Sequence, residues 1–273
     1  MIIQTAPAGE LRLAIMMYEH TALSHQFARA FGNDLFQASE PNDLMFSVVL
    51  NHDAGWAQFD RDPVTDPATA LPYNLVETPA QYITVTSRVS PDFNERQHPF
   101  CGLISSMHSW GLYNGRYGLS SMVLIDKIPP HDRPLAQRML DGELERQKRL
   151  KAELGRDAAT AAWIEEPRLF QSYKQLQFFD TLALYFNRTH PSERQETKFE
   201  HVPLNASEDA SIAVRPRGKG HYELSPWPFA SASGEYAFAG RHIRPGQHEK
   251  SGSWSGVLAS ASTVWESFRL VAA

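Results

Sequence analysis

Apolar residues recur at helical spacing through the first two thirds of the chain. Residues 44–50 form an almost continuous apolar run, which predicts a buried helix. His20, Leu23 and Phe27 follow one another at intervals of three and four, which predicts a helix that ends before Gly32. The same periodicity predicts further helices over residues 99–113, 134–154 and 168–187, and a short helix, rich in β-branched residues, over 82–89.

The pattern changes after about residue 195, where helical periodicity stops. Short β-like segments follow, separated by Gly, Pro, Ser and Asn, and one strand is predicted near the start of the chain. We therefore predict a mainly α fold, with a helical domain over residues 1–195 and a small antiparallel β appendage over 196–273 packed on it. The predicted strands lie at residues 11–17, 211–215, 221–224, 235–239 and 264–271.

Composition describes an ordinary globular protein and excludes several classes. The chain has 273 residues, of which 42% are hydrophobic and 21% charged. A net charge of −5 argues against nucleic-acid binding, which favours a basic surface. With a single cysteine, Cys101, an internal disulfide and a thiolate metal cluster are excluded. No signal peptide or membrane-spanning run is recognisable, so we expect a cytoplasmic protein without a membrane or nucleic-acid partner.

Histidine and aspartate residues stand on or at the end of several apolar helices. The pair His52-Asp53 ends the helix over residues 44–50, and a buried carboxylate is costly unless it is paired or bound to a metal. Side chains projected inward from separate helices are one way to build a metal site in a helical core. The sequence thus predicts a divalent metal site, for Mn, Fe, Zn, Ni or Mg, with the ligands His20, His52, Asp53, His108 and Asp180.

Each of these residues also has an explanation that involves no metal. A single histidine on an apolar face, such as His108, is more often a core residue whose hydrogen bonds are satisfied. His20 could cap its helix, and His52-Asp53 could simply end one. Asp180 is harder to explain, because aspartate is rarely buried without a partner such as Arg or Tyr. Together, the ordered set favours the metal site.

The order His20, His52-Asp53, Asp180 resembles the HD superfamily of metal-dependent phosphohydrolases, in which a first His, a His-Asp pair and a late Asp bind one metal ion. Over residues 15–270 the chain is also similar to a bacterial family of unknown function related to that superfamily. The resemblance implies an HD-like helical bundle. The motifs that carry it are His20-Thr21-Ala22-Leu23-Ser24, His52 to Trp56, Ser106-Met107-His108, Leu176 to Leu184, and Trp227-Pro228-Phe229.

The resemblance implies a metal-dependent hydrolase that acts on a phosphate ester or a nucleotide-like small molecule. Asp53 and His108 would then carry the chemistry, with His108 either a ligand of a second metal or a general acid near the leaving group. Trp56 would form a wall of the substrate pocket. The guanidinium groups of Arg116 and Arg88 are candidates for contact with phosphate, because their fork matches its oxygens.

Two alternatives keep the site and change the function. A di-iron oxygenase on the same scaffold would need more histidine ligands, so His98 and His108 would both have to reach the site. A non-catalytic module with a degenerate site would only bind a small molecule. The departure at Tyr18, where the resemblance leads us to expect another histidine, slightly favours the binding module over a fully equipped enzyme.

Overall fold

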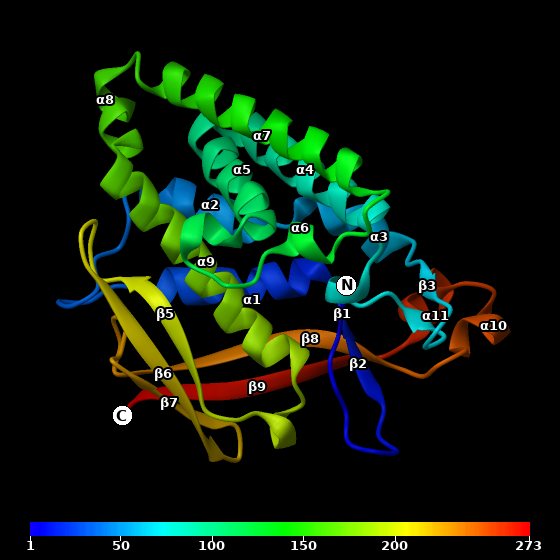
Figure 1. Ribbon diagram of the computed structural model, residues 1–273. Coiled ribbons are helices and arrows are strands. Elements are labelled where there is room, and N and C mark those ends of the chain that lie inside the picture. Colours follow the sequence, from blue (N-terminus) through cyan, green and yellow to red (C-terminus); the bar gives the residue numbers. More distant parts are fainter.

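Helices lie over one face of a curled β-sheet (Figure 1). The structure is a computed structural model that describes residues 1–273, apart from the side chain of Val76. Helices α1 (Met17–Ala30) and α9 (Glu166–Arg188) pack on each other and on the sheet, and α2, α4, α5 and α7 form the outer helical layer. These four helices span Asn42–Asn51, Ala80–Gln97, Pro99–Tyr113 and Arg133–Leu154, and the shorter α3, α6, α8, α10 and α11 span Ala57–Arg61, Leu124–Lys127, Ala158–Ala161, Gln247–Ser251 and Trp254–Ser260.

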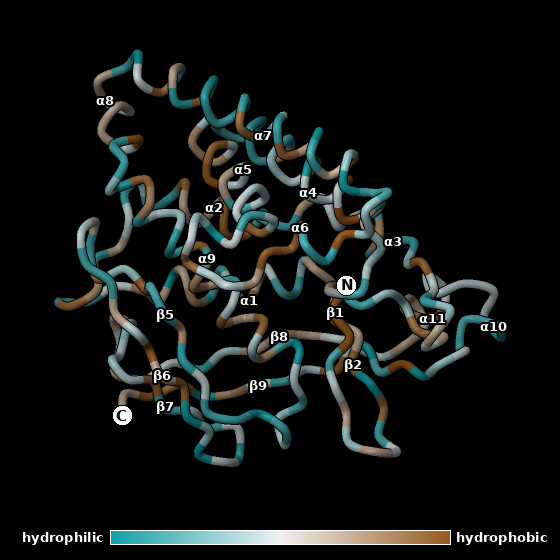
Figure 2. Tube along the Cα trace, viewed as in Figure 1, coloured by the Kyte–Doolittle hydropathy of each residue, from teal (hydrophilic) through white to brown (hydrophobic). Residues whose placement is uncertain are grey.

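The predicted long helices are confirmed, and the helix predicted to be short is longer than expected. The segment predicted as a short helix over residues 82–89 is part of α4, which runs to Gln97. Its β-branched residues are tolerated because the hydroxyls of Thr84 and Thr86 donate to the carbonyls of Ala80 and Ile83 in the preceding turn. Along α7 in Figure 2, brown stretches alternate with teal ones, as expected for a helix with one apolar face.

The sheet takes strands from both ends of the chain. Its order is β1-β2-β8-β9-β7-β6-β5, antiparallel except where β7 runs parallel to β9. The N-terminal β2 pairs with β8 through Ala14 and Arg241. The strands of this sheet are β1 (Ile2–Ile3), β2 (Arg12–Ile15), β5 (Thr197–Pro203), β6 (Asp209–Gly218), β7 (His221–Ser225), β8 (Ser233–Ile243) and β9 (Thr263–Ala272). A separate hairpin joins β3 (Thr65–Asp66) to β4 (Leu71–Pro72).

The prediction of a mainly α, HD-like helical bundle with a small antiparallel β appendage is therefore wrong. The fold is mixed α/β, and its sheet is a full layer that includes the N-terminal strands. One apolar core joins the helices to this layer: the rings of Phe186 and Phe268 stack at 3.8 Å, and those of Phe27 and Tyr236 lie 4.8 Å apart. The division into two domains at residue 195 stays a prediction.

Candidate metal centre

The corner after α2 presents His52 and Asp53 to the interior. The helix ends at Asn51, and Asp53 takes φ −110° and ψ 23°, in the sparsely populated bridge region between helix and strand conformations. The backbone N–H of Gly55 then donates to Ser90 Oγ of α4 at 2.9 Å. A Cβ atom at Gly55 would lie 2.2 Å from the carbonyl oxygen of Thr86, so the glycine lets this corner dock against α4.

We expect Gly55→Ala to disturb the corner and the metal site with it. The added methyl group meets backbone, which yields little, so we expect a loss of about 1–3 kcal/mol in the free energy of unfolding. Denaturant unfolding of wild type and variant measures this loss. Gly142→Ala in α7 is the control, because its Cβ meets open space and alanine favours a helix. A Gly55→Ala protein as stable as wild type would contradict the close docking.

The two innermost imidazoles have fixed tautomers. His20 Nδ1 lies 2.9 Å from the side-chain oxygen of Asn187, and His52 Nδ1 lies 2.7 Å from the carbonyl oxygen of Val49. Both Nδ1 atoms therefore carry the proton and donate it, which leaves a lone pair on each Nε2. Both side chains are fully buried, and neither Nε2 atom has a hydrogen-bond partner among the described residues.

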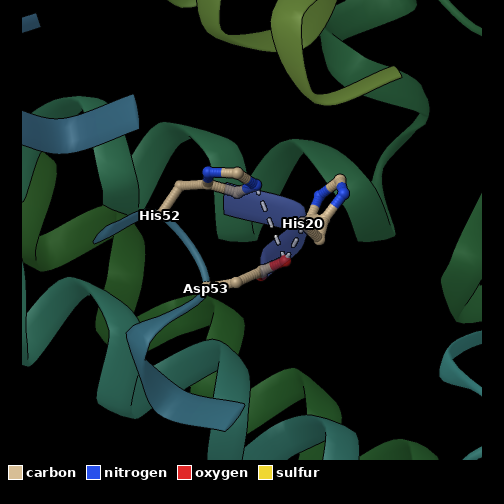
Figure 3. Close-up of side chains that lie close together, drawn as sticks. All are labelled: His20, His52 and Asp53. Carbon is tan, nitrogen blue, oxygen red and sulfur yellow. Dashed lines mark ion pairs between the residues drawn. The ribbon is translucent and has the colours of Figure 1, made fainter. Parts of the chain in front are cut away.

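Two carboxylates meet these lone pairs. Asp180 Oδ1 lies 3.2 Å from His20 Nε2 and 3.9 Å from His52 Nε2, and Asp53 Oδ2 lies 3.9 Å and 3.5 Å from the same two atoms. In Figure 3, dashed lines join both imidazoles to the Asp53 carboxylate. Ligands bound about 2.0–2.2 Å from one ion lie roughly 3.0–3.6 Å from one another, close to these separations. His20, His52 and Asp53 thus form one group that could hold a divalent cation, and Asp180 lies against the same two imidazoles.

Charge in this cluster favours a cation. Burial alone would raise the pKa of Asp180, but the neighbouring imidazoles of His20, His52 and His108 hold it well below its ordinary value. Burial would lower the pKa of His20, yet the nearby carboxylates of Asp180 and Asp53 raise it above its ordinary value. Asp180 is therefore ionised in the interior, and a buried carboxylate needs a positive charge beside it, either a proton on His20 or a bound metal ion.

His108 of α5 completes a second, overlapping group with His52 and Asp180, whose ligand atoms all lie within 4.8 Å of one another. Its Nδ1 atom accepts a hydrogen bond from the amide nitrogen of Gln177 at 2.7 Å, which places the ring proton on Nε2. Burial lowers the pKa of His108 to about 4. His108 is accordingly neutral near pH 7 and offers a hydrogen-bond donor beside the ligands.

One face of α9 organises the site. Gln177, Asp180, Leu184 and Asn187 follow at intervals of three, four and three, so they lie on one stripe of the helix. The stripe supplies a carboxylate and, on either side of it, the two amides that set the tautomers of His108 and His20. Sequence reasoning identified Asp180 and missed the two amides, although their spacing from it is a signal that places them on the same face.

A cavity of about 990 Å³, including its open mouth, adjoins the ligands. His52, Asp53, His108 and Asp180 line it, and Trp56 forms part of its wall at the position the sequence predicted. Arg116 lines the cavity as well. Arg88 lies on the exposed side of α4 and is not one of the described residues that line it.

The turn that carries Arg116 has an unusual backbone. Gly115, Arg116, Tyr117 and Gly118 all have positive φ angles, of 62°, 52°, 58° and 87°. Each non-glycine residue in this left-handed conformation costs roughly 1–2 kcal/mol. Tyr117 offsets this strain, since its ring packs 4.7 Å from that of Trp110 and its hydroxyl donates to a side-chain oxygen of α7. The strained turn thus holds Arg116 in the cavity beside the candidate metal ligands.

Two other sequence-predicted residues lie outside the cluster. His98 begins α5, where its Nδ1 atom accepts a hydrogen bond from the backbone N–H of Phe100 at 3.0 Å, and its ring faces Trp163. Tyr18, at the position where another histidine was expected, is 57% exposed. Among the described helices, none is both long and apolar enough to cross a membrane.

These features define a mixed α/β protein whose buried histidine and aspartate side chains could hold a metal ion. The chain belongs to the family DUF3891, described as "Protein of unknown function (DUF3891)", whose model matches residues 1–244. The matched region includes each ligand residue of the candidate metal centre. Neither the curated proteins nor the solved structures contain a significant match to this chain.

Proposed function

We propose that this protein is a metal-dependent phosphohydrolase that acts on a small phosphate ester. The observation that carries the proposal is the convergence of two buried, unpartnered imidazole lone pairs on two carboxylates at the end of a cavity. His20, His52, Asp53 and Asp180 would hold one divalent ion. When bound, such an ion lowers the pKa of a bound water towards neutrality and polarises a phosphoryl oxygen.

The residues around the ligands support hydrolysis. In the reaction, the water oxygen forms a bond to phosphorus, the bond from phosphorus to the ester oxygen breaks, and one water proton ends on the released alcohol. Arg116 would bind the phosphate oxygens with its guanidinium fork. Asp53, which is more exposed than Asp180, would accept the water proton on the cavity side. His108 would donate a hydrogen bond to the ester oxygen as it leaves.

The order of the ligands gives further support. A first His, a His-Asp pair and a late Asp resemble the metal ligands of the HD superfamily, and this resemblance rests on residue order and types, not on the fold. The oxygenase alternative gains no support, since it needs His98, which caps α5 and faces Trp163. A module that only binds a small molecule would share the cavity and lack the turnover.

Hydrolysis of p-nitrophenyl phosphate by protein loaded in turn with Mn, Fe, Zn, Ni or Mg tests the proposal. We expect turnover with at least one metal, and we expect His52→Gln to lower it by at least about 100-fold, because even outer-shell changes cost 10–100-fold. His98→Gln is the matched control and should keep wild-type turnover. A metal-loaded protein that hydrolyses no phosphate ester, or a His52→Gln variant with full activity, would contradict the proposed function.

A further inference from the structure

The cavity next to the metal centre extends along α9. Asp180, Leu184 and Arg188 all line it, and they follow one another at intervals of four residues on one face of the helix. At a rise of 1.5 Å per residue, the backbone positions of Asp180 and Arg188 lie about 12 Å apart. The cavity therefore has metal ligands at its inner end, an apolar residue at its middle and a cation at its outer end.

The middle of the cavity has mainly apolar walls that come from several elements. Three of the four hydroxyls that line the cavity already have partners, and the fourth is that of Ser109. Ser90 Oγ accepts from the backbone N–H of Gly55, Ser87 Oγ bonds the hydroxyl of Tyr113, and Thr86 bonds within α4. A ribose or base buried here would lose its hydrogen bonds to water and find few in return. The apolar wall residues are Leu75, Ile83, Leu112, Met122, Leu124 and Leu184.

Arg188 at the outer end is available to a ligand. Its side chain is exposed at the end of α9 and makes no ion pair with the residues that the structure describes. By contrast, Arg194 a short distance along the chain is buried in an ion pair with Glu266. A free guanidinium at the mouth of a cavity matches the paired oxygens of a carboxylate or phosphate.

We propose that the site takes an amphipathic phosphomonoester. Its reacting phosphate lies at the metal centre beside Arg116, its apolar chain or ring lies along Leu184, and a second anionic group, carboxylate or phosphate, binds Arg188. This substrate class rests on the proposed function, because the metal centre is what binds the reacting phosphate. It favours an apolar phosphate ester over a nucleotide.

Calorimetric titration of the metal-loaded protein with non-hydrolysable phosphonates tests this substrate class. The probes are octylphosphonate, octane-1,8-bisphosphonate and an octylphosphonate that ends in a carboxylate, and the last two separate phosphate from carboxylate at the outer end. We expect at least one of the two probes with an anionic group at each end to bind about tenfold more tightly than octylphosphonate. One charged, hydrogen-bonded contact accounts for a gain of this size. Ethane-1,2-bisphosphonate is too short to reach Arg188 and should show no such gain.

Variants separate Arg188 from the rest of the surface. Arg188→Gln should abolish the gain from the second anionic group and leave the affinity for octylphosphonate unchanged. Arg168→Gln, which removes an exposed arginine near the other end of α9, is the matched control and should keep the gain.

Three results would overturn the substrate class while leaving the proposed function intact. The first is equal affinity for octylphosphonate and for both probes with an anionic group at each end. The second is a gain in affinity from the second anionic group that survives in Arg188→Gln. The third is tighter binding of a nucleoside phosphonate than of octylphosphonate. If the metal-loaded protein binds none of the phosphonates, both the substrate class and the proposed function are wrong.

Discussion

Asp180→Asn is expected to abolish tight binding of a divalent metal ion. Asp180 is buried, its pKa lies well below its ordinary value, and its Oδ1 atom lies within 4 Å of both Nε2 lone pairs of the candidate centre. An amide keeps the shape of the side chain and removes its charge. Loss of one partner from a buried charged group costs about 3–5 kcal/mol, which corresponds to a loss of roughly 100- to 4,000-fold in affinity.

Competition between the protein and a chelator for Mn²⁺ or Zn²⁺ measures this change. Asp53→Asn should lose affinity in the same direction, because it removes the other carboxylate of the set. Asp34→Asn, at an exposed position, is the control and should bind like wild type. Wild-type affinity in both ligand variants would place any metal elsewhere. A wild type that never binds metal, together with an Asp180→Leu protein that is more stable, would support a buried ion pair instead.

The pH dependence of stability is expected to reverse when the metal is removed. In the metal-free protein, nearby carboxylates raise the pKa of His20 above its ordinary 6.5. Its pairing with Asp180 therefore contributes stability that is fully present below pH 6.5 and is lost as the pH rises through the raised pKa. The lowered pKa of Asp180 contributes stability that is present above its ordinary 3.8 and is lost only in strong acid.

Metal binding requires His20 to be unprotonated at Nε2. The ion competes with the proton for Nε2, so affinity should fall by about tenfold for each pH unit below the raised pKa, for one displaced proton. Thermal unfolding between pH 5 and 8, with a chelator and with saturating metal, measures both curves. We expect metal to add most stability at high pH, where the metal-free protein loses the His20 contribution. Parallel curves for the two states would show that no proton leaves the site on metal binding.

The helices, and the buried positions of the candidate ligand residues, were predictable because their signals are local. An apolar stripe that includes His20, or an apolar run that ends in His52-Asp53, is visible within a dozen residues. The same holds for His98, whose place before Pro99 is typical of a helix start and explains why it lies outside the cluster.

The sheet and the cavity were harder to predict because they depend on distant partners. The strand predicted over residues 11–17 contains β2, but its place in the sheet depends on pairing with β8, more than 200 residues away. Strand β1 has only two residues, too few for an alternating pattern, and joins the sheet by pairing with β2. Strand β5 alternates between partly buried and exposed residues over its first four positions and carries few apolar residues. In the sequence Arg188 looks like an ordinary surface arginine. Only the structure shows that it lines a cavity together with residues of α4, α5 and α6.

Anomalous X-ray scattering from crystals of the protein loaded with Mn²⁺ tests the metal centre most directly. We predict one strong peak within coordination distance, about 2.0–2.3 Å, of His20 Nε2, His52 Nε2, Asp53 and Asp180. Crystals of Asp180→Asn prepared in the same way should lose that peak. A peak at any other site, or protein whose four side chains remain metal-free at saturating Mn²⁺, would contradict the central claim.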